Sequence, residues 1–146
     1  MAVASTAIRI AESLVQLLNA NADHLGAAFV ARREYLVQWT LGDTDALRVT
    51  VVPPEMVTAE QASRASYQHD YVLGVVVQKR VPPTDAAIDP LFDLVERMGD
   101  LIRREPLADP VAHCVALAFN PFYSPEDLKE MRQFTSVIVP TFRLWR

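Results

Sequence analysis

The sequence predicts an α+β fold: a mostly antiparallel or mixed sheet of about five strands with two main helices packed on one face. Two segments repeat apolar residues every three or four positions, which is the period of an amphipathic helix. The other regular segments alternate apolar and polar residues, or are apolar on both faces, as strands do. In chain order the elements read α-β-β-β-α-β-β.

Length and composition predict a single globular domain, residues 1–146. Hydrophobic residues make up 51% of the chain and charged residues 22%, which suits a packed core. The net charge of −4 gives no electrostatic reason to bind nucleic acid from solution. Cys114 is the single cysteine and has no partner for an internal disulfide, which suits a reducing compartment. No apolar run approaches the ~20 residues of a membrane span, and the first residues lack a signal-peptide pattern.

Start signals and apolar stripes define the two helices. Residues 4–20 form the first, with Ser5 or Thr6 as the N-cap. In the second, Asp89 is the natural N-cap and Pro90 takes the first helical position, where its missing N–H is harmless. The core-facing stripe of the second helix consists of Leu91, Leu94, Val95, Met98, Leu101 and Ile102.

Three strands are predicted between the helices. Residues 27–39 alternate along their length, and after a turn at 42–45 a short β-branched strand follows at 47–52. It ends at Pro53-Pro54, because proline cannot donate a ladder hydrogen bond. Residues 55–66 are expected to be a polar connection with some helix-forming character. Residues 71–77 form a strand that is apolar on both faces, so we expect a neighbouring strand on each side and cover above and below.

Two strands follow the second helix. Residues 111–119 alternate between a larger face and a small face that a helix or a neighbouring subunit can approach closely. Residues 120–130 are a loop with a helical turn, and residues 134–145 are the last strand. Pro140 within this strand predicts a sheet edge or a bulge. The residues of the small face are Ala112, Cys114, Ala116 and Ala118.

The apolar residues exceed what two helices on one face of a sheet can cover, and we expect like copies of the chain to bury the rest. The polar run Ser63-Arg64-Ala65-Ser66 leads into the two-sided strand and has no core to join. We therefore expect the segments 55–68 and 120–133 to reach neighbouring subunits. The last strand is expected to pair with an adjoining edge.

Two adjacent pairs contain catalytic residue types, but their spacing argues against catalysis. His69-Asp70 and His113-Cys114 each lie at a predicted strand, where neighbours point to opposite faces and cannot share a pocket. The three histidines, which include His24, lack the spacing of a zinc site, and the four glycines form no phosphate-binding loop. The sequence therefore predicts no catalytic residue, no metal and no cofactor.

Polar segments with arginines precede two of the strands, and aromatic residues lie close to them. Arginines in such positions form bidentate contacts with carboxylates of a neighbouring subunit, and aromatic side chains are favoured at interfaces. Ordinary solvated turns are the alternative interpretation. The candidate interface residues are Arg64, Tyr67, His69, Phe122, Tyr123, Arg132, Phe134 and Trp145.

By the order of five short motifs, the chain resembles a group of small structural proteins of tailed phages and prophages. These proteins are encoded among head-completion and tail genes. The order of elements also resembles tail-terminator or tail-completion proteins, and the resemblance covers residues 27–144. The motifs are Val49-Thr50-Val51-Val52-Pro53, Ser63-Arg64-Ala65-Ser66, His69-Asp70-Tyr71, Val77-Gln78-Lys79-Arg80 and Arg132-Gln133-Phe134-Thr135-Ser136-Val137.

The resemblance implies a virion structural protein of the head–tail neck, a tail terminator without catalytic residues. Such a subunit forms a hexameric ring that caps the tail tube and joins it to the connector, and DNA passes through the lumen without sequence-specific binding. The implied partners are further copies of the chain, the tail tube protein and a head-completion or connector protein, with no membrane. The implied location is the tail or neck of the virion, after assembly in the cytoplasm of the bacterial host.

Three alternatives stay open at this point. The first is a head–tail connector, a stopper or a minor capsid component. The second is a small enzyme that uses His69 or Cys114, and the third is a host-derived binding module.

Overall fold

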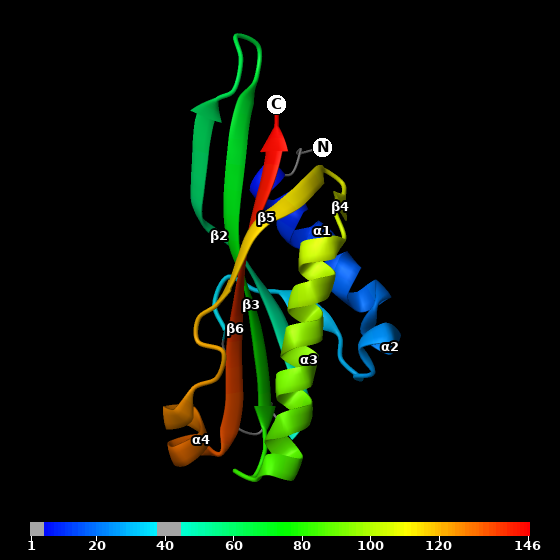
Figure 1. Ribbon diagram of the computed structural model, residues 1–146, viewed down its shortest axis with the longest axis vertical. Coiled ribbons are helices and arrows are strands. Elements are labelled where there is room, and N and C mark those ends of the chain that lie inside the picture. Colours follow the sequence, from blue (N-terminus) through cyan, green and yellow to red (C-terminus); the bar gives the residue numbers. More distant parts are fainter. Residues whose placement is uncertain (1–4, 38–44) are drawn as a thin grey trace.

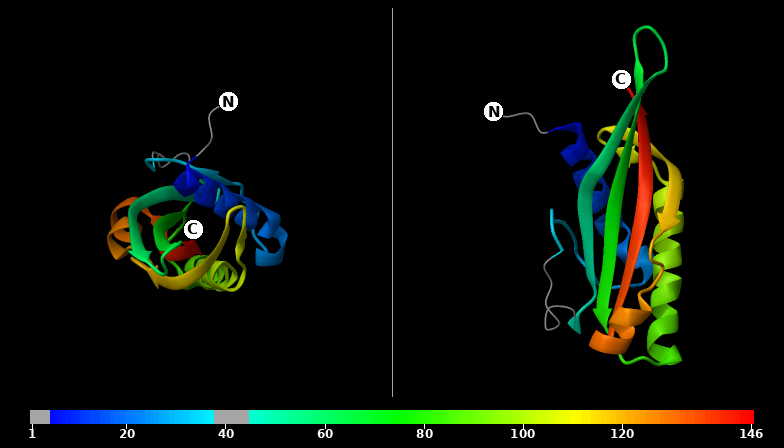
Figure 2. Two further views of the ribbon diagram at one scale, coloured as in Figure 1. Left: turned by 90° about the horizontal axis from the view of Figure 1, so that it is seen from above. Right: turned by 90° about the vertical axis from the view of Figure 1, so that its left-hand side faces the viewer.

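A six-stranded mixed sheet carries helices α1 and α3 on one face, in a computed structural model that describes residues 5–37 and 45–146 (Figures 1 and 2). The strand order is β1-β2-β3-β6-β5-β4. The predicted α+β class is confirmed, and α2, β4 and α4 are short additions to it. The elements are α1 (Thr6–Ala20), α2 (Ala22–Leu25), β1 (Ala31–Arg33), β2 (Arg48–Gln61), β3 (Tyr67–Arg80), α3 (Asp85–Arg104), β4 (Leu107–Ala108), β5 (Val111–Phe119), α4 (Pro125–Met131) and β6 (Gln133–Trp145).

The apolar stripes of α1 and α3 meet one face of the sheet in a continuous core. All six predicted stripe residues of α3 are buried, and Leu73, Val75 and Val77 of β3 point toward them. Buried and half-buried residues alternate along most of β6, which is the pattern of a strand with helices over one face only. None of the helices in the described ranges is long and apolar enough to cross a membrane.

The start of α1 agrees with the sequence prediction, and the start of α3 does not. Ser5 Oγ accepts a hydrogen bond from the Ile8 N–H at 3.2 Å, so Ser5 is the N-cap of α1. Helix α3 begins one turn earlier than predicted, with Thr84 rather than Asp89 as its N-cap. Pro90 is tolerated inside this helix because both the proline and Ala86, four residues earlier, are exposed, so water can satisfy the Ala86 carbonyl that lacks its N–H partner.

The third predicted strand lies at the centre of the sheet. β3 pairs antiparallel with β2 on one side and β6 on the other, which confirms the expected neighbours. β6 lies between β3 and β5, so of the two expectations from Pro140, an edge or a bulge, the edge position is wrong, whereas a register shift does occur nearby, between Cys114 and Ala116 of β5. Pro140 is accommodated at a break in the ladder: the β3–β6 pairs stop at Val72↔Thr141 and resume at Val75↔Ile138.

Strand β2 continues through Pro53-Pro54 to Gln61, although the sequence predicts that it ends there and that residues 55–66 are a connection. The prolines fall in a register irregularity between Val52 and Met56. The parallel partner β1 pairs only with residues 49–51 of β2. Beyond Val51 the strand is an edge within the described chain, where missing N–H groups remove few ladder bonds.

The first predicted strand, 27–39, is reduced to the three residues of β1. Asn19 of α1 bonds to Ala31 at the start of this strand: its side-chain oxygen accepts from the Ala31 N–H at 2.7 Å and its NH₂ donates to the Ala31 carbonyl at 3.2 Å. These bonds tie β1 to α1, while β1 pairs with β2 through Ala31↔Val49. Residues 38 and 39 and the predicted turn at 42–44 lie outside the described residues.

Strand β5 has the predicted bounds, but its two faces are not divided as predicted. A register shift between Cys114 and Ala116 changes the phase of the alternation. Ala112 before the shift is buried, whereas Ala116 and Ala118 after it are exposed. Leu117 and Phe119 therefore pack on the core, and no continuous small face exists.

Gly99→Ala is expected to destabilise the protein, although alanine is the better helix former by about 1 kcal/mol. A Cβ at Gly99 would lie 2.7 Å from Phe119 Cζ. The Phe119 ring has little room to retreat, because the Phe122 ring lies 4.9 Å away between centroids. Overpacking costs about 1–3 kcal/mol, so we expect a net loss in the free energy of unfolding, measured by urea denaturation.

The matched control is the same substitution in the Phe119→Leu background, where the ring is gone. There Gly99→Ala should be neutral or stabilising. Stabilisation by Gly99→Ala in the otherwise unchanged protein would show that the close approach of α3 to β5 is not a constraint.

Candidate interaction surface

A two-stranded hairpin projects from one end of the molecule (Figure 1). We call residues 56–72, the end of β2 and the start of β3, the arm. Its register is regular from Met56↔Val72 to Gln61↔Tyr67. The turn is closed by a bond from the Ala62 N–H to the Ser66 carbonyl at 3.1 Å and by the hydroxyls of Ser63 and Ser66 at 2.9 Å. Arg64 lies exposed at the tip.

The arm carries a row of rings on the same face as the core. His69 lies between Tyr67 and Tyr71, with centroid distances of 6.4 Å to each. Tyr71 is buried at the root, whereas Tyr67 is 47% exposed. Nδ1 of His69 is buried and has no hydrogen-bond partner among the described residues. The row therefore continues the core into a part of the chain where one side is open to solvent.

An ion pair across β3 and β6 stiffens the root of the arm. Asp70 accepts two hydrogen bonds from Arg143, at 2.9 and 3.1 Å, and both side chains are partly buried. Bonding to Asp70 raises the pKa of Arg143 above its usual value. A bidentate pair of this kind fixes the orientation of both side chains. It ties Asp70, the fourth residue of the arm's second strand, to the last strand of the sheet.

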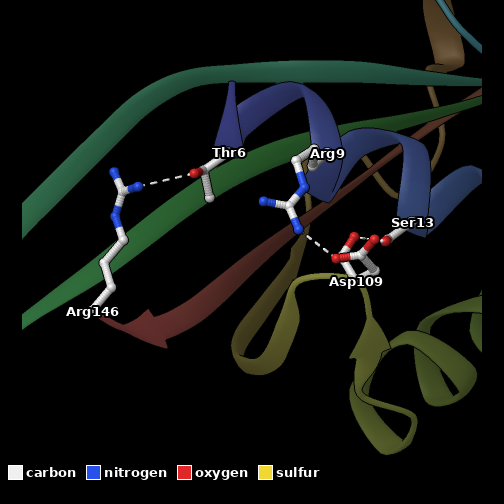
Figure 3. A network of polar contacts seen from close by, with 5 residues as sticks. All are labelled: Thr6, Arg9, Ser13, Asp109 and Arg146. Atoms are coloured by element: carbon white, nitrogen blue, oxygen red, sulfur yellow. Dashed lines mark hydrogen bonds and ion pairs between the residues drawn. The ribbon is translucent and has the colours of Figure 1, made fainter. Parts of the chain in front are cut away.

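The end of β6 is held on two sides. The backbone of Arg146 exchanges hydrogen bonds with Tyr67, at 2.7 and 3.0 Å. Figure 3 shows the Arg146 guanidinium donating to Thr6 Oγ1 at 3.0 Å, at the start of α1. In the same view Arg9 pairs with Asp109, which joins α1 to the turn before β5. The arm therefore starts from a sheet end that α1 and the 109 turn hold in place.

The face of the sheet opposite the helices is apolar below the arm. We call this face the outer face. It contains a shallow groove of about 380 Å³. The valines on this face are half-buried, and the described helices leave the groove open. Its lining includes Val52, Met56, Val72, Gly74, Val76, Val137 and Val139.

The predicted interface residues fall into two groups at opposite ends of the molecule. Arg64, Tyr67, His69 and Trp145 lie on or beside the arm, since Trp145 pairs with Gln68. The other four, Phe122, Tyr123, Arg132 and Phe134, lie near α4 (Figure 1).

The group near α4 is partly internal. Phe134 is 0% exposed, and Phe122 packs edge-on against Phe92 at 5.0 Å, so both belong to the packing of this subunit. Tyr123 is 40% exposed. Arg132 is exposed in the left-handed conformation (φ 50°) that ends α4, and its carbonyl accepts from the Val81 N–H at 2.8 Å.

Sequence reasoning missed the exposed apolar residues at the two edges of the sheet. Met56 and Val57 on β2 are 56% and 47% exposed, and Val111 and Val115 on β5 are 63% and 44% exposed. The signal for β2 was the β-branched pair Val57-Thr58, followed after a Ser-rich turn by a strong strand. No comparable signal in the sequence marks the bulge at Val115.

The two pairs with catalytic residue types are separated as their spacing predicts. Asp70 is engaged by Arg143, whereas His69 stacks on Tyr71 on the other face. Cys114 is half-buried and donates to the Ala116 carbonyl at 3.2 Å, and His113 is exposed. In residues 5–37 and 45–146, no three His, Cys, Asp or Glu side chains gather as a metal site requires.

The Cys114 thiol is expected to react slowly with iodoacetamide. Burial raises the pKa of this thiol above the ordinary value of about 8.5, so the thiolate forms only at higher pH than in a free cysteine. The pH midpoint of the alkylation rate, followed by mass spectrometry, should lie above that of glutathione. The difference should vanish in denaturant, and a midpoint below that of glutathione in the native protein would indicate an activated cysteine.

No protein-family model matches the sequence, and no curated protein is significantly similar to it. The fold, in contrast, is similar to that of a chain in a solved structure titled "Virion of native gene transfer agent (GTA) particle". The TM-score is 0.62 at 13% sequence identity, over 98% of this chain and 100% of that chain. The two chains therefore share a fold along their whole length.

Proposed function

We propose that the protein is a structural component of a phage-like virion, a tail terminator that forms a homo-oligomeric ring in the head–tail neck. The observation that carries the proposal is the full-length fold similarity to a chain of a gene transfer agent virion. The motif order in residues 27–144 supports the same class independently of the fold. The ring would cap the tail tube and join it to the connector.

The surface of the subunit suits assembly better than catalysis. The outer face presents half-buried valines around an open groove, and the arm extends beyond the body of the subunit with exposed Arg64 and Tyr67. Exposed apolar surface that is continuous over several residues marks protein interaction sites. The ion pair of Asp70 with Arg143 holds the arm in one direction, so it can contact a neighbour without a large ordering cost.

Native mass spectrometry and negative-stain electron microscopy of the purified, concentrated protein test the ring. We expect a closed oligomer with a central opening, in which a hexamer matches the tail-terminator resemblance. A different ring size would favour a connector or stopper. A protein that stays monomeric at the highest soluble concentration would contradict the proposal.

Arg64→Glu is expected to leave the subunit folded and to weaken assembly, because the side chain lies exposed at the tip of the arm. Arg64→Lys is the matched control, since it keeps the charge at the tip. The far-UV circular dichroism and melting temperature should stay unchanged in both variants, while the ring fraction on a sizing column falls only for Arg64→Glu. Loss of folded structure in Arg64→Glu would show instead that Arg64 serves the turn.

A further inference from the structure

We propose that copies of this chain join edge to edge: the β2 edge of the arm in one copy pairs antiparallel with the free β5 edge of the next copy. The proposal rests on the proposed ring and names the contact that builds it. It requires two strands whose outward backbone groups have no partner in the subunit. Both strands can be identified from the hydrogen bonds of the sheet.

On β2, the register determines which backbone groups point outward. Glu34 donates its N–H to the Val51 carbonyl at 3.1 Å, so the backbone N–H and C=O groups of Val51 point away from β3. The backbone groups of the residues on either side of Val51 point toward β3. In the arm, the bond from the Ala62 N–H to the Ser66 carbonyl puts the even-numbered residues on the β3 side. The N–H and C=O groups of Val57, Ala59 and Gln61 therefore point away from β3, where the described chain supplies no strand.

On β5, the corresponding groups belong to Cys114, Leu117 and Phe119. Asn120 donates to the Val137 carbonyl at 2.9 Å, which places the even-numbered residues after the bulge on the β6 side. The odd-numbered residues 117 and 119 then face away from β6. Strand β4 covers only residues 111 and 112, so the rest of this edge has no strand partner within the described residues.

The chemistry of the two edges favours a second copy as the occupant. Exposed apolar residues lie on both, Met56 and Val57 on β2 and Val115 on β5. Glu60 points to the outer face, whereas Arg103 belongs to α3 on the opposite face and pairs with Asp100 at 3.1 Å, so the match between the two edges is apolar and not ionic. A second copy is the natural occupant, because one chain supplies both edges and neither edge has a strand partner among the described residues.

Strand direction agrees with this arrangement. Three antiparallel steps separate β2 from β5, so these two strands run in opposite directions. A copy rotated about an axis along the strands would then add its β2 antiparallel to the neighbour's β5. Such a contact joins different surfaces of identical subunits. It closes into a ring when the rotation from one copy to the next is an integer fraction of a full turn. A shift of a few residues along the strands, as tilted strands require on closure, brings residues 57–61 beside residues 114–119.

A proline at an outward position tests the backbone bonds. Ala59→Pro removes an N–H that points away from β3 and has no strand partner among the described residues, so the monomer should keep its circular dichroism spectrum while the ring is lost on a sizing column. Ala59→Val, which keeps the N–H, should assemble normally. If Ala59→Pro unfolds the arm, the cysteine experiment below decides the question.

Cysteine pairs test the partner strand. Two proteins that both carry Cys114→Ser are mixed, one with Ala116→Cys and one with a cysteine on the β2 edge, and are oxidised with copper phenanthroline. In a continued sheet, Thr58→Cys shares the outer face with Ala116→Cys and should give a disulfide-linked heterodimer. Ala59→Cys points to the other face and should give at least tenfold less.

The outcomes separate the two proposals. A ring that persists in Ala59→Pro, without a cross-link from Thr58→Cys, would overturn edge pairing and leave the ring in place. Equal cross-linking of Thr58→Cys and Ala59→Cys would also overturn it, because a sheet distinguishes its faces. A protein that is monomeric throughout would overturn the ring itself and edge pairing with it.

Discussion

The structure depends on one constraint: the sheet is apolar on both faces, and the two helices cover only one. The central strand β3 shows this most clearly, because Leu73, Val75 and Val77 are buried under the helices while Val72 and Val76 are half-buried on the outer face. Among the described residues, no helix contributes to the lining of the groove on the second face. What remains open is the surface on which the proposed assembly is built.

The free energy gained by burying the outer face is too small to hold a partner by itself. Full burial of a valine side chain contributes about 1.5–3 kcal/mol, and Val72, Val76, Val137 and Val139 are already half-buried. Covering all four adds about 4 kcal/mol, whereas association costs roughly 4–15 kcal/mol in lost freedom of motion. A stable contact needs further interactions, and the arm and the unpaired sheet edges are the described parts of the surface that can supply them. This comparison favours an interface that combines apolar contact with backbone pairing.

The sequence predicted the structure correctly where a pattern of apolar residues decides which element forms. The stripe from Leu91 to Ile102 identified α3, and the two-sided strand identified the centre of the sheet. The errors arose where tertiary contacts outweigh a local signal. Pro53-Pro54 indicated the end of a strand, but at an edge the missing N–H groups remove few bonds, so β2 continues for several residues. Pro140 indicated an edge or a bulge, and a break in one ladder accommodates it in an interior strand. Phe134 was included among the interface residues because aromatic residues are common there, and the core buries it completely.

The two edges also contain features that limit uncontrolled pairing, and these fit a contact that forms only with a specific partner. Exposed edges invite aggregation, and natural proteins protect them with prolines, charges and bulges. Here Pro53-Pro54 interrupts the β2 edge below the arm, Glu60 adds a charge within it, and the bulge at Val115 interrupts β5. What remains are two short stretches, residues 57–61 and 117–119, each too short to recruit an arbitrary strand. A copy in the correct orientation presents the second stretch together with apolar contacts, so the restriction that protects the free subunit also selects the partner.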